Sequence, residues 1–186
     1  MIKPNLMNKD DGATLVEFAL VAPLFVLVLF ASFQIGFVML IQNALDAAVR
    51  EASRVGITGA REANLSREQA INATVQNVVR KYTGGFVDPS RLNVIVKSYP
   101  SLDSIGDPEP FSDTNNNGVR DGNEPFTDIN NNNVWDVDQG ISGSFGLSGQ
   151  VVQYEINYEW DTIFPIFGRS SKIVLRGITP VVNEEY

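Results

Sequence analysis

The chain contains no histidine and no cysteine among its 186 residues. Without these side chains it has no Ser-His-Asp or Cys-His nucleophile, no zinc site with His or Cys ligands and no disulfide framework. Most familiar enzyme chemistries are excluded with them. We therefore expect a protein that is not an enzyme.

Basic residues are scarce where acidic residues gather. Residues 100–140 contain nine Asp and Glu residues against one base, Arg120, so this segment alone accounts for the net charge of −8. Acidic and basic residues balance over the rest of the chain. A nucleic-acid-binding surface needs a clustered basic patch, and the sequence therefore predicts no nucleic-acid partner.

Charge is absent from the 24 residues of Phe18–Ile41. As a helix this run would measure about 36 Å, slightly more than the roughly 30 Å hydrocarbon core of a bilayer. The length predicts a transmembrane helix, since a helix buried on all sides would be unusual in so small a protein. Lys3 and Lys9 precede the run and Arg50 and Arg54 follow it, so the positive charges leave its orientation open.

A lone carboxylate, Glu17, stands at the start of the apolar stretch, five positions after Gly12. An ionised carboxylate in lipid is costly unless it is paired, so Glu17 is a candidate functional residue. Cleavage after Gly12 would create an α-amino group on Ala13. That group, on the same chain or on a neighbouring copy, could neutralise Glu17.

The block GATLVEFALVAP, residues 12–23, resembles the cleavage region of type IV pilin-like precursors, in which a prepilin peptidase cuts after glycine and glutamate is fifth in the mature chain. The continuation LIQNALDAAVREASRVGITG is similar to the TadE-like minor pseudopilins of tight-adherence (Tad) pilus systems. The resemblance implies a leader of residues 1–12, processing by prepilin peptidase, and Glu17 as the residue that registers neighbouring subunits. An uncleaved signal anchor with a chance Glu17 is the alternative.

Pro23 lies inside the predicted helix and removes the hydrogen bond to the Ala19 carbonyl. The resulting kink would let a pilin helix bend as it passes from bilayer to filament. The alternative is a kink without a functional role. Beyond the apolar run the pattern continues as an amphipathic helix without a breaker, and one long helix is predicted from Thr14 to Val55.

Ser66 and Gln69 form the pattern of a capping box and predict a second helix that runs to about Tyr82. Its predicted buried stripe comprises Ile71, Val75, Val78 and Tyr82.

Three β-rich runs follow, at residues 92–99, 150–160 and 172–179, and Phe164–Gly168 is the predicted hairpin loop between the last two. Helices first and strands afterwards indicate an α+β fold. We expect a pilin-like arrangement, which the resemblance also implies: a long N-terminal transmembrane helix and a second helix packed on an antiparallel sheet of three or four strands.

The predicted chain has three parts, of which cleavage would remove the first. The leader is followed by a transmembrane and assembly helix, residues 13–42, and by an extracytoplasmic pilin-like domain, residues 43–186. An acidic, Asn-rich insertion at residues 100–148 interrupts this domain. So long a loop is uncommon in a compact domain unless it has a function.

The centre of the insertion, DTNNNGVRDGNE, matches the calcium-loop pattern D-x-[DN]-x-[DN]-G-x5-E. This first loop, residues 113–124, offers oxygen ligands only, which favours a hard cation such as Ca²⁺. Gly118 permits the sharp turn at position six. The expected ligands are Asp113, Asn115, Asn117, the Val119 carbonyl, Asp121 and Glu124.

The pattern returns fifteen residues later as DINNNNVWDVDQ, the second loop, residues 128–139. Asn133 replaces the glycine, and Gln139 replaces the closing acid, so this site should be weaker or share a ligand. The tandem resembles the calcium loops of thrombospondin-type and dockerin-like modules and predicts one or two bound Ca²⁺ ions. A solvated, disordered Asn-rich loop is the alternative. The expected ligands are Asp128, Asn130, Asn132, the Val134 carbonyl, Asp136 and Asp138.

The resemblance implies a structural subunit, a minor pilin or pseudopilin that contacts other pilin subunits through its N-terminal helix. It would be held in the bacterial inner membrane by a single pass with its C-terminal domain outside, and would reach the cell surface after assembly. A membrane-anchored, calcium-dependent adhesin that binds through the insertion and Trp135 is the alternative.

A hydrolase that uses two of the carboxylates Glu155, Glu159 and Asp161 is disfavoured. These residues alternate along one predicted strand, opposite its aromatic side chains. An ordinary exposed strand face accounts for such a pattern.

Overall fold

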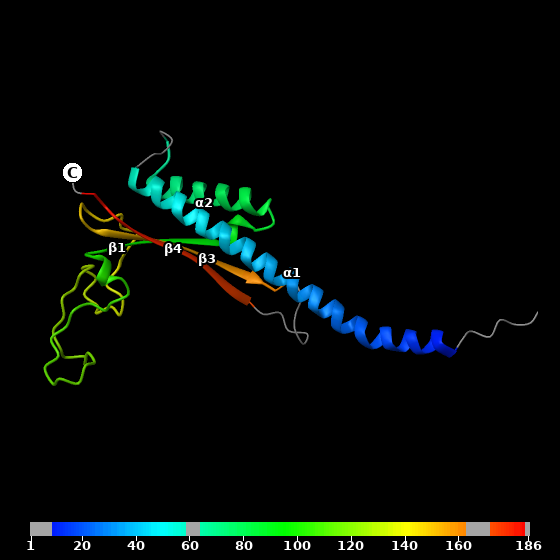
Figure 1. Ribbon diagram of the computed structural model, residues 1–186. Helices are drawn as coiled ribbons and strands as arrows, with labels where there is room; N and C mark the ends of the chain where they lie inside the picture. Colours follow the sequence, from blue (N-terminus) through cyan, green and yellow to red (C-terminus); the bar gives the residue numbers. More distant parts are fainter. Residues whose placement is uncertain (1–8, 59–63, 163–171, 185–186) are drawn as a thin grey trace, which may run out of the picture.

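Two helices cover one face of a four-stranded antiparallel sheet in the computed structural model (Figure 1). The structure describes residues 9–58, 64–162 and 172–184. The first eight residues of the predicted leader and the predicted hairpin loop Phe164–Gly168 lie outside this part of the chain. The α+β prediction is confirmed in the described residues.

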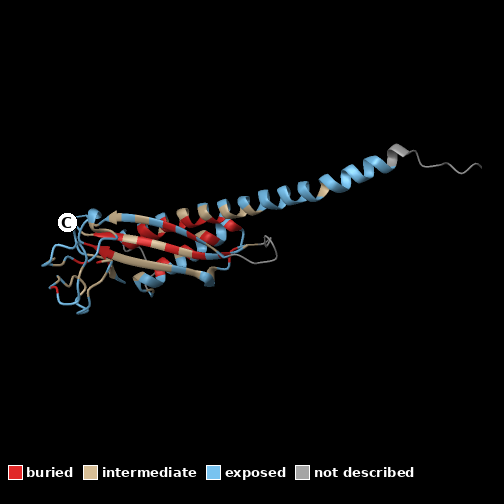
Figure 2. Ribbon diagram, turned by 90° about the horizontal axis from the view of Figure 1, so that it is seen from below, coloured by how far each residue is buried: buried red, intermediate tan, exposed pale blue. Residues whose placement is uncertain are grey.

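Helix α1, Lys9–Thr58, is a single helix that continues through Pro23. It is longer at both ends than the predicted Thr14–Val55. Its N-terminal half is exposed, and burial begins where it reaches the sheet (Figure 2). Small side chains on its C-terminal half allow the close contact: Ala44, Ala48 and Ala52 are fully buried.

Helix α2, Arg67–Thr83, begins after the predicted N-cap Ser66 and ends one residue beyond the predicted Tyr82. The Ser66 hydroxyl accepts the Gln69 N–H at 3.2 Å, and the Gln69 side chain accepts the Ser66 N–H at 2.9 Å. These bonds satisfy N–H groups that the first turn of a helix leaves unpaired. Gly84 caps the C-terminus.

The predicted buried stripe of α2 was partly wrong. Ile71 and Val75 are buried as expected, but Val79 continues the stripe and Tyr82 is 54% exposed. Val78 is only half-buried. The side chains of α2 that face the core are spaced four residues apart. Tyr82 is three positions after Val79, so it lies beside this row and not in it.

The sheet has the strand order β2-β1-β3-β4, with every neighbouring pair antiparallel. Its strands are β1 Leu92–Tyr99, β2 Ile141–Ser142, β3 Val151–Asp161 and β4 Lys172–Val182. Two short 3-10 helices, η1 Pro89–Arg91 and η2 Leu102–Ser104, flank β1. The sequence did not predict β2, whose two residues are too few to show a period.

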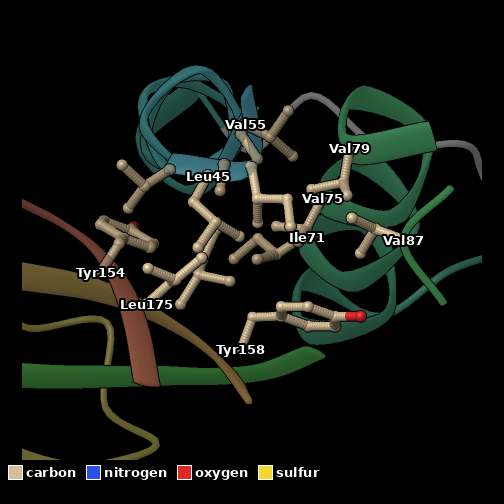
Figure 3. Packing of buried hydrophobic residues seen from close by; sticks show 14 of the residues in the cluster. Leu45, Val55, Ile71, Val75, Val79, Val87, Tyr154, Tyr158 and Leu175 are labelled. Atoms are coloured by element: carbon tan, nitrogen blue, oxygen red, sulfur yellow. The ribbon is translucent and has the colours of Figure 1, made fainter. Parts of the chain in front are cut away.

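The core lies between the helices and the inner face of the sheet (Figure 3). β3 buries every second side chain, as its alternation predicts: Val152, Tyr154, Ile156, Tyr158 and Trp160. Leu45 from α1 and Leu175 from β4 pack in the same core, between the helices and the sheet (Figure 3). This packing holds the end of β3 that carries Trp160 near the point where α1 leaves the domain, with the acidic insertion at the opposite end (Figure 1).

Candidate functional site

The residues that the sequence assigns to processing and assembly lie on the exposed N-terminal half of α1. Gly12, Ala13, Glu17 and Pro23 are all exposed. Exposed large apolar side chains surround them from Leu15 onward. α1 between Gly12 and Thr58 is long and apolar enough to cross a membrane. So large an apolar surface is expected to be covered, by lipid or by other protein.

In the first loop, side chains at alternate positions converge on one carboxylate. Asn115 and Asn117 both donate their amide Nδ2 to Asp121 Oδ2, at 2.6 and 3.1 Å. Asp113 accepts the backbone N–H of Gly118 at 2.8 Å, which closes the turn. The φ angle of Gly118 is 76°, in the left-handed region that the pattern predicts for position six.

Glu124 fastens the end of the first loop to its beginning. Its buried carboxylate accepts the Thr114 N–H at 2.7 Å and the Asp121 N–H at 3.0 Å. The Asp121 N–H, followed by that of Thr114, holds the pKa of Glu124 below its ordinary value, against the opposing effect of burial. Glu124 is therefore ionised at neutral pH.

The second loop repeats the first contact by contact. Asn130 and Asn132 donate to Asp136 Oδ2 at 2.6 and 2.8 Å. Asp128 accepts the Asn133 N–H at 2.7 Å, and the φ angle of Asn133 is 61°. Asn therefore takes the left-handed conformation at position six, as expected of this residue type.

The closing acid of the second loop comes from earlier in the chain. Glu109 is 0% exposed, and its two oxygens accept the N–H of Ile129 at 2.7 Å and of Asp136 at 3.1 Å. Ile129 and Asp136 hold the positions in the second loop that Thr114 and Asp121 hold in the first. Glu109 thus does for the second loop what Glu124 does for the first.

The sequence predicted a second loop that is weaker or shares a ligand, because Gln139 replaces the acid at position twelve, and Glu109 makes the contacts of that acid from outside the loop. Gln139, at its twelfth position, instead donates its backbone N–H to the Asp107 carbonyl at 2.9 Å. A sequence signal for Glu109 exists: Glu-Pro-Phe occurs at residues 109–111 and again at residues 124–126, fifteen positions apart. The repeat therefore begins four residues before each loop.

Backbone contacts between the repeats follow the same reciprocal pattern. Phe111 and Phe126 form an antiparallel bridge. The Ser112 N–H of the first repeat donates to the Pro125 carbonyl of the second at 2.8 Å. In the other direction, the Thr127 N–H donates to the Pro110 carbonyl, also at 2.8 Å. Because bonds of equal length run both ways, the two repeats are related by an approximate twofold arrangement.

Side chains at position eight of each loop complete this arrangement. Arg120 donates to the Glu124 carbonyl at 3.0 Å, and Trp135 Nε1 donates to the Glu109 carbonyl at 2.8 Å. Trp135 also packs edge-on against Phe111, with ring centroids 6.1 Å apart. We call residues 109–139 the paired-loop unit, because each half is closed by the other.

Asp138 ties the paired-loop unit to the sheet. Its Oδ2 accepts Lys97 Nζ at 2.6 Å and the Tyr99 hydroxyl at 3.3 Å. Burial disfavours its charged form, but Lys97 and the Gly140 N–H outweigh burial and lower the pKa of Asp138. Burial, together with Asp138, raises the pKa of Tyr99. Asp138, expected as a metal ligand, is engaged with β1.

The two residues expected to offer carbonyl ligands have exposed side chains. Val119 and Val134 donate their backbone N–H to Asn117 and Asn132, at 2.8 and 2.6 Å. Each loop thus brings an Asp and two Asn side chains together. No group of three or more His, Cys, Asp or Glu side chains suited to a metal lies among the described residues. In each loop, two of the three convergent side chains are amides.

The carboxylates considered for hydrolysis are engaged in ion pairs on the outer face of the sheet. Glu155, Glu159 and Asp161 each contact a basic side chain, at 3.2, 2.9 and 2.9 Å respectively. Their partners are Arg176, Lys172 and Arg91. These ion pairs explain why the three carboxylates are present on this face, and no catalytic role is needed to explain them.

Comparison with protein families matches residues 12–54 to the TadE-like proteins. The N-terminal segment is therefore similar to the TadE-like proteins. This TadE-like segment begins at Gly12, the predicted cleavage position, and contains the exposed half of α1 and its first buried turns. Comparison with curated proteins and with solved structures found no match.

The TadE-like segment covers less than a quarter of the chain. The sheet and the paired-loop unit lie beyond it.

Proposed function

We propose that this protein is a pilin-like structural subunit of a Tad-type pilus, held in the bacterial inner membrane by one pass with its C-terminal domain outside. One observation carries the proposal: the TadE-like match begins at Gly12 and coincides with a helix half whose large apolar side chains are exposed. Lipid covers this half before assembly, and the helices of other subunits cover it afterwards.

Processing after Gly12 by a prepilin peptidase follows from the same proposal. The new α-amino group on Ala13 then pairs with Glu17 of an adjacent subunit. In an apolar helix bundle, either charge left unpaired would be costly, so the pair sets the register between subunits.

Intact mass and N-terminal sequencing test the processing step. The protein is taken from its native membrane or from a sheared surface fraction, and we expect a chain that begins at Ala13. A chain that retains residues before Ala13 would contradict processing. That outcome would favour the alternative, a membrane-anchored adhesin that binds through the paired-loop unit.

We further propose that each half of the paired-loop unit binds one Ca²⁺ ion. The convergent side chains offer oxygen atoms suited to a hard cation, provided that the Asn amides turn to present Oδ1. A bound ion would neutralise carboxylates that otherwise repel, and external calcium is high enough for sites of about 10⁻⁴ to 10⁻³ M affinity. The proposed ligands are Asp113, Asn115, Asn117, Val119, Asp121 and Glu124 in the first site, and Asp128, Asn130, Asn132, Val134, Asp136 and Glu109 in the second.

Thermal unfolding of the full chain in detergent tests calcium binding. We expect a higher melting temperature in calcium than in chelator, and no such difference after Asp113→Ala with Asp128→Ala. Asp103→Ala, an exposed acid outside both loops, should keep the difference. An unmodified chain that melts at the same temperature in both conditions would overturn the calcium proposal and leave the pilus proposal standing.

A further inference from the structure

The domain meets the exposed half of α1 without a linker. α1 is continuous from Lys9 to Thr58, and its side chains become buried within the last turns of the apolar run. Phe37 is the first large side chain of α1 that packs against the core, and Ile41, one turn later, is fully buried. The helix therefore fixes the distance between the membrane and the domain.

Helix length places that boundary near Phe37. The segment from Phe18 to Phe37 has twenty residues, and at about 1.5 Å per residue it matches the roughly 30 Å hydrocarbon core. Whatever packs beside Phe37 would then lie at the level of the lipid headgroups.

Aromatic side chains from three elements meet at this level. Phe37 stacks on Phe86, which follows α2, with ring centroids 4.7 Å apart and planes within 14°. Trp160, near the end of β3, lies 5.5 Å from Phe86 and 6.5 Å from Phe37, measured between centroids. We call these three side chains, together with the exposed Tyr82 four residues before Phe86 in the chain, the aromatic base.

The aromatic base is only partly covered by the domain. Phe86 is 48% exposed and Tyr82 is 54% exposed. Trp160 is only 6% exposed, yet its Nε1 has no hydrogen-bond partner among the described residues. Buried indole N–H groups usually find a partner, and the described residues of this fold leave the Trp160 donor unused.

We infer that the aromatic base rests in the headgroup region of a phospholipid bilayer and seats the domain directly on the membrane. Trp and Tyr favour this region because an apolar ring with one polar group suits a boundary between hydrocarbon and water. The surface is continuous with the membrane-crossing helix. The paired-loop unit, which also has exposed apolar side chains, lies at the far end of the domain (Figure 1). The inference rests on the membrane anchor, and it does not depend on cleavage, calcium or pilus assembly.

The two tryptophans of the chain allow a matched test. Trp160 lies in the aromatic base and Trp135 in the paired-loop unit. The segment that forms this unit lies at the end of the domain away from the exposed half of α1 (Figure 1). Trp135→Phe leaves Trp160 as the only tryptophan, and Trp160→Phe leaves Trp135. Each full-length variant is reconstituted in phosphatidylcholine vesicles that contain a lipid with a spin label close to the headgroup.

We expect the label to reduce Trp160 emission at least twofold and to leave Trp135 emission unchanged. Tyr82→Ser with Phe86→Ser should weaken the quenching of Trp160, whereas Leu147→Ser, an exposed apolar residue elsewhere in the domain, should not. A third variant, the insertion reporter, has both tryptophans replaced by Phe and carries Phe25→Trp. It reports insertion of α1 through a label placed deep in the bilayer.

Unquenched Trp160, together with a quenched insertion reporter, would overturn the inference and leave the membrane anchor standing. Quenching of neither would overturn both. Equal quenching of Trp160 and Trp135 would show a domain lying on its side, which also contradicts a seat formed by the aromatic base.

Discussion

Glu109 and Glu124, which begin the two fifteen-residue repeats, each close the loop of the other repeat. Glu109 precedes the first loop and accepts two backbone N–H groups of the second, at 2.7 and 3.1 Å. Glu124 precedes the second loop and accepts the equivalent two groups of the first, at 2.7 and 3.0 Å. The two repeats therefore depend on one another, although each loop matches a separate motif in the sequence.

Two conservative substitutions, Glu109→Gln and Glu124→Gln, should each loosen the loop of the other repeat. Glu109→Gln replaces one acceptor oxygen with an NH₂ group that faces a backbone donor, at a cost of about 1–3 kcal/mol for a buried group. We expect faster amide hydrogen exchange at Ile129 and Asp136, 20 and 27 residues away in sequence, and a smaller effect at Thr114.

Glu124→Gln is the matched substitution and should speed exchange at Thr114 and Asp121 instead. Both variants are compared with the unmodified chain under the same conditions. If Glu109→Gln affected the first loop and spared the second, the reciprocal arrangement would be wrong.

Acidification should open the first loop through Glu124. The pKa of this carboxyl in the folded protein lies below its ordinary value of 4.5, so the folded state favours the charged form. The stabilisation is fully present above pH 4.5 and is lost as the pH falls through the lowered pKa. Exchange at Thr114 and Asp121, measured from about pH 6 downward and corrected for intrinsic rates, should rise only below about pH 4.5.

Glu124→Gln removes the titrating group and should abolish this part of the pH dependence. An unmodified chain with the same protection at about pH 3 as at about pH 6 would contradict the prediction.

Gly177 on β4 lies where a side chain would strike the backbone of α1. A Cβ atom at this position would approach the Leu45 carbonyl oxygen to 2.9 Å. Since a helix carbonyl cannot move aside cheaply, Gly177→Ala should destabilise the domain by about 1–3 kcal/mol, as overpacking does. Thermal unfolding measures the loss, expected as several degrees in the melting temperature.

Gly36→Ala is the control, because nothing within 4 Å would meet its Cβ. It should leave the melting temperature nearly unchanged. Equal melting temperatures for Gly177→Ala and the unmodified chain would show that α1 and β4 can separate without cost.

Glu17→Ala should leave processing intact and impair assembly. The carboxylate lies beyond the cut after Gly12 and is exposed on α1, where it can pair with a neighbouring subunit in the proposed bundle. Cleavage is followed by N-terminal sequencing, and incorporation by the amount of subunit recovered in sheared pili. Glu68→Ala removes an acid from α2, outside the assembly helix, and should not change incorporation. Normal incorporation of Glu17→Ala would remove the role assigned to Glu17.

The sequence alone determined the elements whose signals are local. The apolar run specified the exposed half of α1, the Ser66 and Gln69 pair specified the start of α2, and strict alternation specified the buried face of β3. The helical features depend on residues within one or two helical turns of each other, and the strand depends on alternation of apolar and polar residues. Such patterns are readable because neighbouring residues decide them.

Only the tertiary structure decided which residues from distant positions meet. It turned Val79 rather than Tyr82 toward the core, and it brought Glu109 to a loop that begins nineteen residues later. Asp138 was likewise drawn to Lys97 on β1, 41 positions away. These choices depend on how whole elements pack and on which buried donors need an acceptor, and neither is determined within a short stretch of sequence.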